Sequence, residues 1–406
     1  MLAAVGTSPI IGRYHRSMRA RELGIRIGLL RTGPNDAITD VAGVRVGHAT
    51  IIAGDGPLVV GQGPVRTGVT VVVPHDGDPW TEPLFAGCHR LNGNGELTGL
   101  EWIREAGQLA GFIGITNTHS VGVVHDALIA HAVGSRSAGA AFWSLPVVGE
   151  TYDGRLSDMD GFHVRPAHVD EAIAAARDAG EGAPVPEGNV GGGTGMICHE
   201  FKGGIGTASR VVPNEAGGFT VGALVQANYG SRELLRIDGV PVGEAIPTSE
   251  VPSPWEDDPV APDRANPSVP AGSGSIIVIL ATDAPLLPHQ CTRLAQRAGL
   301  GIARMGGIAA HGSGDLFLAF ATGNRGLTSP DLGIRGRTAI DVRMLDDGAV
   351  TPLFQAAVEA TEAAIVNALL AARTMTGRDG ITAHALPRER LTEVLARYGR
   401  DPQRAT

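Results

Sequence analysis

The feature that most constrains this chain is a continuous apolar run at residues 276–281, Ile-Ile-Val-Ile-Leu-Ala. Its length and its β-branched residues predict a strand that is buried on both faces. Ser275 stands at the entrance of that strand, and Gly274 precedes it. Glycine reaches backbone conformations that are closed to other residues. Gly274 can therefore let the Ser275 hydroxyl approach the Gly274 carbonyl, a geometry that suits self-cleavage. A plain Gly/Ser loop leading into a strand explains the same residues.

Strand-like and helical patterns follow one another along the rest of the chain, which predicts a layered α/β protein in a single domain, residues 1–406. We expect strands at residues 69–73, 112–116, 142–148, 207–212, 219–227 and 316–321. We expect helices from about residue 96, and at residues 121–133, 169–179, 283–298, 352–372 and 388–398. Small and apolar residues occupy almost every position of residues 121–133, so we expect that helix to be buried all round. Proline and acidic residues dominate residues 247–274, which predicts an exposed linker.

Charge and cysteine usage exclude several classes of protein. The net charge is −9 and Lys202 is the only lysine, so the chain offers no basic stripe for nucleic acid. Cys88, Cys198 and Cys291 are widely spaced, which fits a reducing compartment and neither a disulfide framework nor a zinc site. The amino-terminal residues do not read as a signal peptide, and no run of about 18 apolar residues occurs. We therefore expect a cytoplasmic protein with no membrane partner.

Three familiar kinds of site fit the sequence poorly. The glycine-dense residues 187–195 lack the Lys-Ser or Lys-Thr of a phosphate-binding loop. Residues 75–78, His-Asp-Gly-Asp, have no second ligand cluster to accompany them, so a turn is the better interpretation and we expect no metal and no cofactor. The chain has no Gly-x-Ser-x-Gly elbow, although a triad that uses one of its 13 histidines stays open.

A terminal serine nucleophile fits better. If the bond between Gly274 and Ser275 breaks, Ser275 becomes a chain terminus whose α-amine has a pKa of about 7.7 to 8. One residue then carries both the nucleophile and the base, because the terminal amine takes the proton that histidine takes in a triad. The linker before the bond and the core strand after it supply the flexibility and the rigid support that such a site needs.

Five motifs carry a resemblance to a known family. They are residues 19–28 (RARELGIRIG), 40–48 (DVAGVRVGH), 92–99 (NGNGELTG), 273–278 (SGSIIV) and 281–290 (ATDAPLLPHQ). In these segments the chain resembles the DmpA family, the L-aminopeptidase/D-amidase-esterases, which are grouped with the β-peptidyl aminopeptidases. The similarity runs from about residue 19 to residue 372.

The resemblance implies a fold and an assembly. Family members cut themselves before the nucleophilic serine into two chains that stay together. They fold as a four-layer αββα sandwich, like N-terminal nucleophile hydrolases but with different connectivity, and assemble as homotetramers. Here the cut between Gly274 and Ser275 gives an α-chain of residues 1–274 and a β-chain of residues 275–406.

The resemblance also implies roles for individual residues. Ser313 and Asp315 match a second serine and an acidic residue near the nucleophile. Asn228 matches the asparagine at the oxyanion, and Tyr152 matches a tyrosine at the same site. Glu150 matches a carboxylate that receives the free ammonium of the substrate.

Each of these residues has a plainer explanation. Ser313 lies between glycines and could form only a turn, Asp315 could cap a strand entrance, and Asn228 could end one. Glu150 and Tyr152 could belong to a solvated rim. Ser273 is the main rival nucleophile, because Gly272-Ser273 offers the same local chemistry as Gly274-Ser275.

The function that follows is a self-cleaving aminopeptidase acting on small peptides, amides or esters with a free amine. β-Peptide-cleaving members tend to carry Glu where this chain has Asp315, which favours the L-aminopeptidase/D-esterase type over the β-peptidyl aminopeptidases. Two further alternatives are a nylon-oligomer-type endo-amidase and an acyltransferase similar to ornithine acetyltransferase, and both carry threonine at the cut. A relative that never matures is the last alternative.

Overall fold

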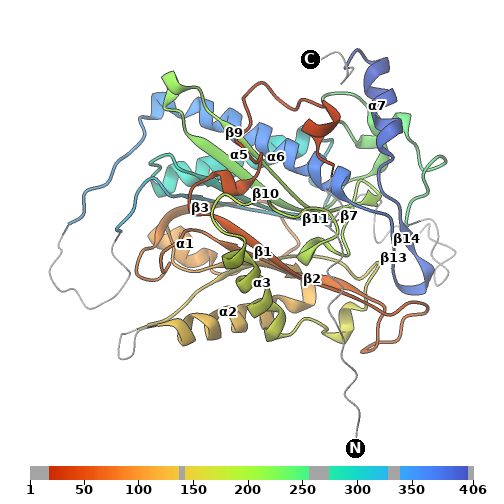
Figure 1. Ribbon diagram of the computed structural model, residues 1–406, viewed down its shortest axis with the longest axis horizontal. Coiled ribbons are helices and arrows are strands. Elements are labelled where there is room, and N and C mark those ends of the chain that lie inside the picture. Colours follow the sequence, from red (N-terminus) through yellow and green to blue (C-terminus); the bar gives the residue numbers. More distant parts are fainter. Residues whose placement is uncertain (1–17, 137–141, 256–273, 328–338, 401–406) are drawn as a thin grey trace, which may run out of the picture.

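Two β-sheets stacked face to face form the centre of the molecule (Figure 1). The computed structural model describes residues 18–136, 142–255, 274–327 and 339–400. The larger sheet has six strands in the order β4-β3-β12-β11-β10-β9. These strands span Gln108–Leu109 (β4), Leu84–Gly93 (β3), Gly314–Ala321 (β12), Ser275–Thr282 (β11), Thr220–Asn228 (β10) and Gly204–Val211 (β9).

The smaller sheet has four strands in the order β1-β2-β5-β6. They span Arg45–Ala53 (β1), Val65–Val73 (β2), Ile113–Asn117 (β5) and Val147–Thr151 (β6). Two short hairpins, Ile197–Cys198 with Phe201–Lys202 (β7, β8) and Met375–Thr376 with Thr382–Ala383 (β13, β14), lie outside both sheets.

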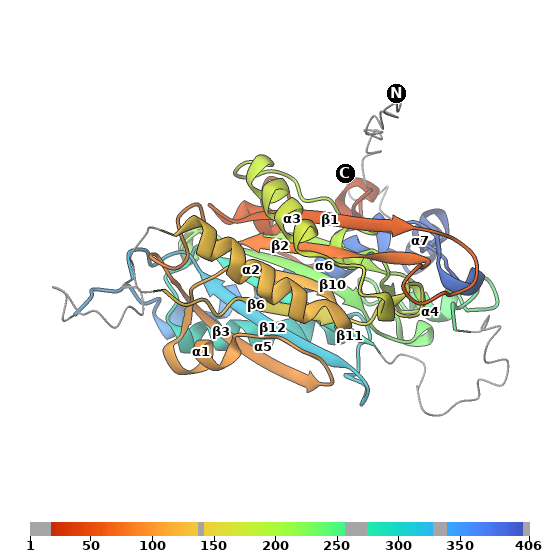
Figure 2. The same cartoon turned by 90° about the horizontal axis from the view of Figure 1, so that it is seen from below.

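Helices cover the outer face of each sheet. α5 (Pro288–Arg304) and α6 (Thr351–Ala371) pack on the six-stranded sheet, whereas α2 (Val121–Ser135) and α3 (Pro166–Asp178) pack on the four-stranded sheet, as Figure 2 shows from below. Three short helices, α1 (Leu100–Ala106), α4 (Val242–Ala245) and α7 (Arg388–Arg397), lie at the periphery. The layers are therefore helix, sheet, sheet, helix, which confirms the predicted αββα sandwich.

The predicted core strand β11 sits at the middle of the larger sheet, antiparallel to β10 and parallel to β12. Every one of its residues is buried. Side chains alternate along a strand, so Ile276 and Val278 face α5 and α6, whereas Ile277 and Ile279 face the second sheet. This double burial is the physical reason why the run is apolar throughout.

Several element boundaries differ from the sequence expectation. α1 begins at Leu100 and not near residue 96, because Leu97 forms a bridge to Gly149. α5 begins at Pro288 and continues through Gly299 to Arg304, since Gly299 is tolerated where the helix packs on the sheet. β6 begins at Val147, five residues later than expected.

One expectation about burial was wrong. The helix α2 buries only Val124, Ala127 and Leu128 among its residues and leaves Val133 exposed, because it lies in an outer layer with one face on β5 and β6. In the described start of the expected linker, residues 247–255, exposed positions such as Pro247 and Glu250 alternate with buried ones, since the Val251 carbonyl accepts a hydrogen bond from Arg232 (2.9 Å) and Ser253 is buried. Residues 256–273 of the linker lie outside the described residues.

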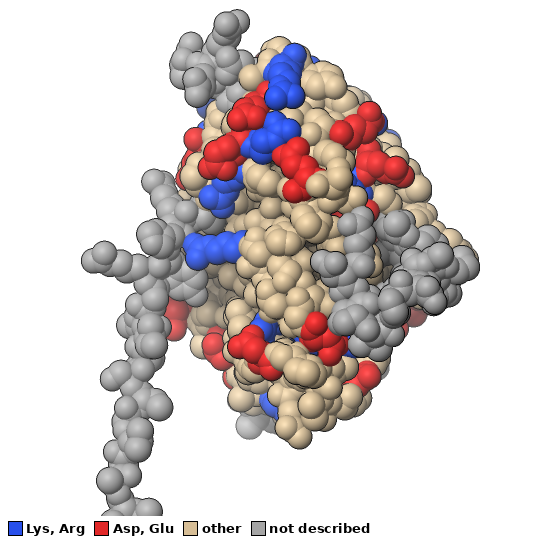
Figure 3. Space-filling model, turned by 90° about the vertical axis from the view of Figure 1, so that its right-hand side faces the viewer, with Lys and Arg blue, Asp and Glu red and all other residues tan. Residues whose placement is uncertain are grey.

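Apolar length and surface charge complete the picture. Residues 347–371, which include α6, are long and apolar enough to cross a membrane by length and composition, but 83% of the apolar window is buried inside the protein, as expected of a core helix. On the described part of the face drawn in Figure 3, acidic and basic side chains are interspersed around a largely uncharged centre.

Candidate functional site

The first residue of β11 is Ser275, and its side chain is 6% exposed. Its Oγ accepts a hydrogen bond from the Gly314 amide of the neighbouring strand (3.1 Å), and the two residues are register partners. Asn228, the last residue of β10, is its register partner on the other side. The ends of three strands therefore meet around the Ser275 hydroxyl.

Gly274 is the residue whose bond to Ser275 was predicted to break. A Cβ at this position would overlap with the carbonyl group of Asn228 and would lie 3.0 Å from Tyr229 Cα. Only glycine fits this close approach to the end of β10. Ser273, the rival nucleophile, lies outside the described residues.

Ser313 and Asp315 are brought together just beside β11. The Ser313 hydroxyl donates a hydrogen bond to Asp315 Oδ1 (2.6 Å), and both side chains are buried. Burial raises the pKa of Asp315 to about 6, although the Ser313 hydroxyl and the Ile276 amide lower it in part. The Asp315 carboxyl therefore changes its charge near pH 6, only slightly below neutral pH.

Asn228 is held by both ends of its amide. Its Oδ1 accepts a hydrogen bond from the Ile197 amide (2.8 Å), and its Nδ2 donates one to the Tyr152 carbonyl (3.0 Å). An amide nitrogen carries two N–H groups, and the second makes no hydrogen bond within the described residues. A rigid asparagine with a free N–H beside a serine hydroxyl is suited to stabilise an oxyanion.

Glu150 comes from the other sheet, near the end of β6. It is 3% exposed; its Oε1 accepts from the Glu96 amide (3.0 Å) and its Oε2 from the Thr118 hydroxyl. A Cβ at Gly95 would lie 3.1 Å from Glu150 Oε1 and 3.2 Å from Gly314 Cα, so a single glycine separates this carboxylate from the start of β12. Burial raises the pKa of Glu150, against the hydrogen bond from Thr118.

Tyr152 contacts the other candidate site residues through its backbone carbonyl and not through its hydroxyl. Its carbonyl accepts the Asn228 bond, whereas its side chain is 46% exposed. The ring lies over Gly154, where a Cβ would come within 2.6 Å of the Tyr152 Oη. Ser275, Asn228, Ser313, Asp315 and Glu150 are thus gathered in one buried region, with Tyr152 at its rim.

No role for the glycine-dense residues 187–195 followed from the sequence, and the structure packs part of them against strands of both sheets, β10 included. Gly191–Gly193 form a short 3-10 helix between the sheets, where a Cβ at Gly192 would come within 2.7 Å of the Ile115 carbonyl oxygen. Lys202, wholly buried, donates hydrogen bonds to the carbonyls of Met196 (2.8 Å), Gly203 (2.9 Å) and Gly193 (3.3 Å). The only signal in the sequence was a lone lysine close to a run of glycines.

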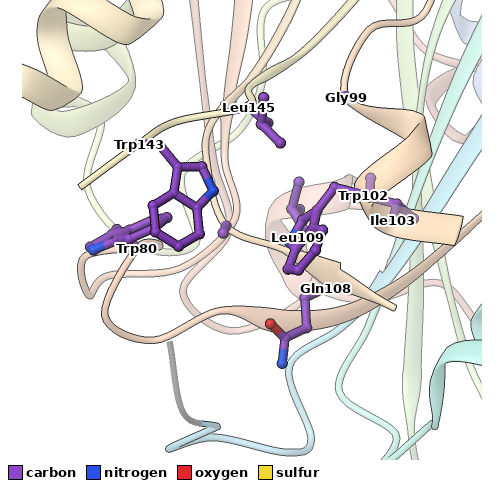
Figure 4. Close-up of a pocket in the computed structure, with 9 residues that line it drawn as sticks. Trp80, Gly99, Trp102, Ile103, Gln108, Leu109, Trp143 and Leu145 are labelled. Carbon is purple, nitrogen blue, oxygen red and sulfur yellow. The ribbon is translucent and has the colours of Figure 1, made fainter. Parts of the chain in front are cut away.

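The competing kinds of site were also located. Residues 75–78 form a turn in which the Gly77 amide donates to His75 Nδ1 (2.9 Å), and no cluster of metal-ligating side chains occurs among the described residues. Within the same part of the chain, no histidine hydrogen-bonds Ser275, Ser313 or Asp315. A shallow hollow elsewhere is lined by Trp80, Trp102 and Trp143 and by no titratable group (Figure 4).

The chain is similar to known peptidases over most of its length. The model of peptidase family S58 matches residues 36–383. The chain is 48% identical over 382 residues to the β-peptidyl aminopeptidase BapA of Sphingosinicella microcystinivorans, covering 94% of this chain and 93% of that protein. It is 30% identical over 361 residues to an uncharacterised aminopeptidase of Mycobacterium leprae, covering 86% of this chain and 94% of that protein.

Solved structures give the same result. A β-aminopeptidase from a Burkholderia species superimposes with a TM-score of 0.84 at 54% identity, covering 94% of this chain and 99% of that chain. The L-aminopeptidase D-Ala-esterase/amidase of Ochrobactrum anthropi, described as a variant of the Ntn hydrolase fold, superimposes with a TM-score of 0.81 at 43% identity and the same coverage. The chain therefore belongs to peptidase family S58, the aminopeptidase family of these relatives.

Proposed function

We propose that this aminopeptidase acts through Ser275 as an amino-terminal nucleophile, after the chain cuts itself between Gly274 and Ser275. The observation that carries the proposal is the meeting of Ser275, Asn228 and the Ser313–Asp315 pair at the ends of β10, β11 and β12. The position of the cut is supported by Gly274, which lies so close to the Asn228 carbonyl that no side chain fits there. The resemblance to the DmpA family supports the same roles for these residues.

Self-cleavage begins when Ser275 Oγ attacks the carbonyl carbon of Gly274. The peptide C–N bond breaks, the nitrogen takes the proton of the hydroxyl, and an ester joins the two parts. Water then hydrolyses the ester, which releases the Gly274 carboxylate and restores the Ser275 hydroxyl. The products are chains of 274 and 132 residues, which we propose to form one domain.

Catalysis on a substrate reuses the same group. The substrate carries a free ammonium, and the buried Glu150 carboxylate is its partner. The α-amine of Ser275 takes the hydroxyl proton as Oγ attacks the scissile carbonyl, and it returns the proton to the leaving amine or alcohol. Asn228 stabilises the oxyanion, with Tyr152 beside it. The Ser313–Asp315 pair keeps the groups around Ser275 in place. Water then hydrolyses the ester and releases the acyl group.

The remaining parts of the proposal concern the setting of the enzyme. We propose a homotetramer of processed units, located in the cytoplasm, that uses no cofactor and has neither nucleic acid nor membrane as partner. Its substrates are small peptides, amides and esters with a free amine. The family resemblance supports the assembly, and the net charge of −9 supports the absence of a nucleic-acid partner.

Denaturing mass spectrometry with an activity assay tests the proposal. The wild-type protein should separate into fragments of 274 and 132 residues, whereas Ser275→Ala should stay at 41.8 kDa and be inactive. The matched control is Ser273→Ala, which should be cut and active. An intact active wild-type chain, or a cut Ser275→Ala protein, would contradict the mechanism.

A blocked substrate tests the requirement for a free amine. An amino acid p-nitroanilide should be cleaved, and its N-acetyl derivative should not. Equal rates on both would favour the endo-amidase alternative, and transfer of the acyl group to an added amine in place of water would favour the acyltransferase.

A β-peptidyl aminopeptidase is the second candidate function. It is favoured by the two highest of these identities, 54% and 48%, which are to proteins named as β-aminopeptidases, although a second BapA, of Sphingosinicella xenopeptidilytica, and the L-aminopeptidase D-Ala-esterase/amidase are both 43% identical. Rates on p-nitroanilides of L-alanine, D-alanine and β-homoalanine at one concentration decide between the two. A preference for β-homoalanine would assign the β-peptidyl specificity, in spite of Asp315.

A further inference from the structure

Tyr229 directly follows the oxyanion candidate Asn228, but its side chain points the other way. Alternation along β10 places the Asn228 amide toward the second sheet and the Tyr229 ring in the core below α5 and α6. The residue is 5% exposed, and its ring packs edge-on against His199 at a centroid distance of 5.0 Å. Within the described residues its hydroxyl has no hydrogen-bond partner. A buried phenol without a partner costs stability unless something satisfies it.

Asp315 lies on the same side of the sheet. The odd-numbered residues that follow it on β12, Phe317 and Ala319, face α5 and α6, so alternation turns Asp315 toward that layer. Ser275 faces the second sheet, together with Ile277. The Asp315 carboxyl therefore lies on the opposite face of the sheet from Ser275. Its link to the region around the nucleophile is the hydrogen bond that it accepts from the Ser313 hydroxyl.

One small cavity is lined by both Tyr229 and Asp315. It is lined by Tyr229, Ser313 and Asp315 together with Leu234, Ile302 and Ile308. The volume in which the centre of a water molecule fits is about 20 Å³, which is enough for one water. Burial raises the pKa of the Tyr229 hydroxyl well above its usual value, and the charges of Cys198, then Asp315 and Glu362, add to the rise.

We propose that one water molecule in this cavity accepts a hydrogen bond from the Tyr229 hydroxyl and donates one to the Asp315 carboxylate, which makes Tyr229 a positioning residue for the Ser313–Asp315 pair. The inference rests on the proposed function of Ser275. It extends the site by one residue that acts through Asp315 and not on the substrate.

The bridge has a consequence for the pH dependence of activity. A donor held at the charged form of a carboxyl lowers its pKa, so the water opposes the rise that burial causes at Asp315. The titratable groups that face Tyr229 are His199, Cys198 and Glu362. Burial lowers the pKa of His199 to about 4 and raises that of Cys198 to about 12, so both are uncharged near neutral pH. Glu362, which pairs with Arg304 (2.8 Å), is the one rival carboxylate among them.

The test is the pH profile of kcat/KM for the processed Tyr229→Phe protein. Phenylalanine keeps the ring against His199 and removes the hydroxyl alone. The lower of the two steps expected in the acid limb, that of Asp315 near pH 6 and below the step of the Ser275 α-amine, should move to higher pH by about half a unit or more, because the water is no longer held by the hydroxyl and the carboxylate loses it as a donor. The matched control is Tyr398→Phe, which removes an exposed phenol at the end of α7 and should leave the profile unchanged.

Two further variants assign the effect. In an Asp315→Asn background the Tyr229→Phe substitution should cause no further shift, whereas in a Glu362→Gln background it should cause the full shift. A crystal structure of the wild type should show a water within hydrogen-bonding distance of both Tyr229 Oη and the Asp315 carboxylate.

The outcomes separate the two proposals. An unchanged acid limb in Tyr229→Phe, a dry cavity, or a shift that survives in Asp315→Asn would overturn the bridge, even with a wild type that is cut and Ser275-dependent. A wild type whose activity survives Ser275→Ala would instead overturn the proposed function.

Discussion

At the scale of single residues, Glu150 is a buried carboxylate that a cationic partner would stabilise. The carboxylate is 3% exposed, and its described hydrogen bonds come from two neutral donors, the Glu96 amide and the Thr118 hydroxyl. A substrate ammonium placed beside it would form a buried ion pair, which is worth far more than one at the surface.

We therefore predict that Glu150→Gln lowers kcat/KM on a free-amine p-nitroanilide by about 2 to 5 kcal/mol of lost binding, or roughly 30-fold or more. Self-cleavage should continue, because the bond between Gly274 and Ser275 has no free ammonium before it. Steady-state kinetics and denaturing gels measure the two effects. Glu96→Gln changes an exposed side chain nearby and serves as the control. Unchanged kinetics in Glu150→Gln would contradict the role.

Asp153 is a second buried acid near the site. It is fully buried, and burial raises its pKa to about 7, although Thr67 and Asn117 lower it in part. Its folded-state pKa lies above the unfolded value of 3.8, so the folded protein keeps this proton between those two values. The stability that the neutral carboxyl contributes is present at low pH and is lost as the pH rises through about 7.

The prediction is that Asp153→Asn, which mimics the neutral carboxyl, makes the free energy of unfolding less dependent on pH. Between pH 5 and pH 8 the wild type should lose stability relative to the variant by about 2 to 3 kcal/mol, since about two pH units of this range lie below the folded-state pKa. Urea unfolding at the two pH values measures this difference. Asp170→Asn, at an exposed position on α3, should track the wild type. Parallel curves for Asp153→Asn and wild type would refute the prediction.

At the scale of elements, the decisive contact is between the start of β11 and the end of β10. Gly274 lies against the Asn228 carbonyl so closely that a side chain there must displace one of the two strand ends. Ser275 and Asn228 are register partners, so a displacement moves the proposed nucleophile relative to the Asn228 amide beside it.

We expect Gly274→Ala to slow self-cleavage at least about tenfold, since about 1.4 kcal/mol of misplacement in the transition state suffices for that loss. The fraction cut is followed on denaturing gels after expression. Gly122→Ala, on α2 with open space around it, should be cut at the wild-type rate and should be slightly more stable. Complete cutting of Gly274→Ala would show that this contact does not control the reaction.

The elements also show where local patterns succeed. Residues 276–281 and 316–321 were predicted as strands and form parts of β11 and β12, because strands buried on both faces must be apolar throughout. The pattern of α2 misled, since alanine and valine suit an outer helix as well as a core one. The start of β6 could not be placed, because residues 142–146 are as apolar as the strand that follows them.

At the scale of the whole molecule, the two proposed chains are interleaved within one sheet. The order β4-β3-β12-β11-β10-β9 places β11 and β12 of the second chain between strands of the first. α5 and α6 of the second chain then cover both parts of the sheet. A cut before Ser275 removes none of these contacts.

The cut protein should therefore elute as a single species from a native sizing column, and its two chains should separate only when it is unfolded. The β-chain of residues 275–406 should be insoluble when expressed alone, because β11 and β12 then expose both edges. Expression of both chains from separate genes should restore the native species. Chains that separate without denaturant would contradict the interleaved arrangement.

The sequence by itself determined the local facts: a buried strand opening with a serine, a glycine before it, and the motifs of a family. Tertiary structure alone decided how those residues relate in space. Glu150 comes from a different sheet, more than a hundred residues away, and only the stacking of the sheets brings it near Gly314. Asp315 faces the opposite side of the sheet from Ser275, because strand register sets which face each side chain takes, and register is fixed by pairing between distant segments.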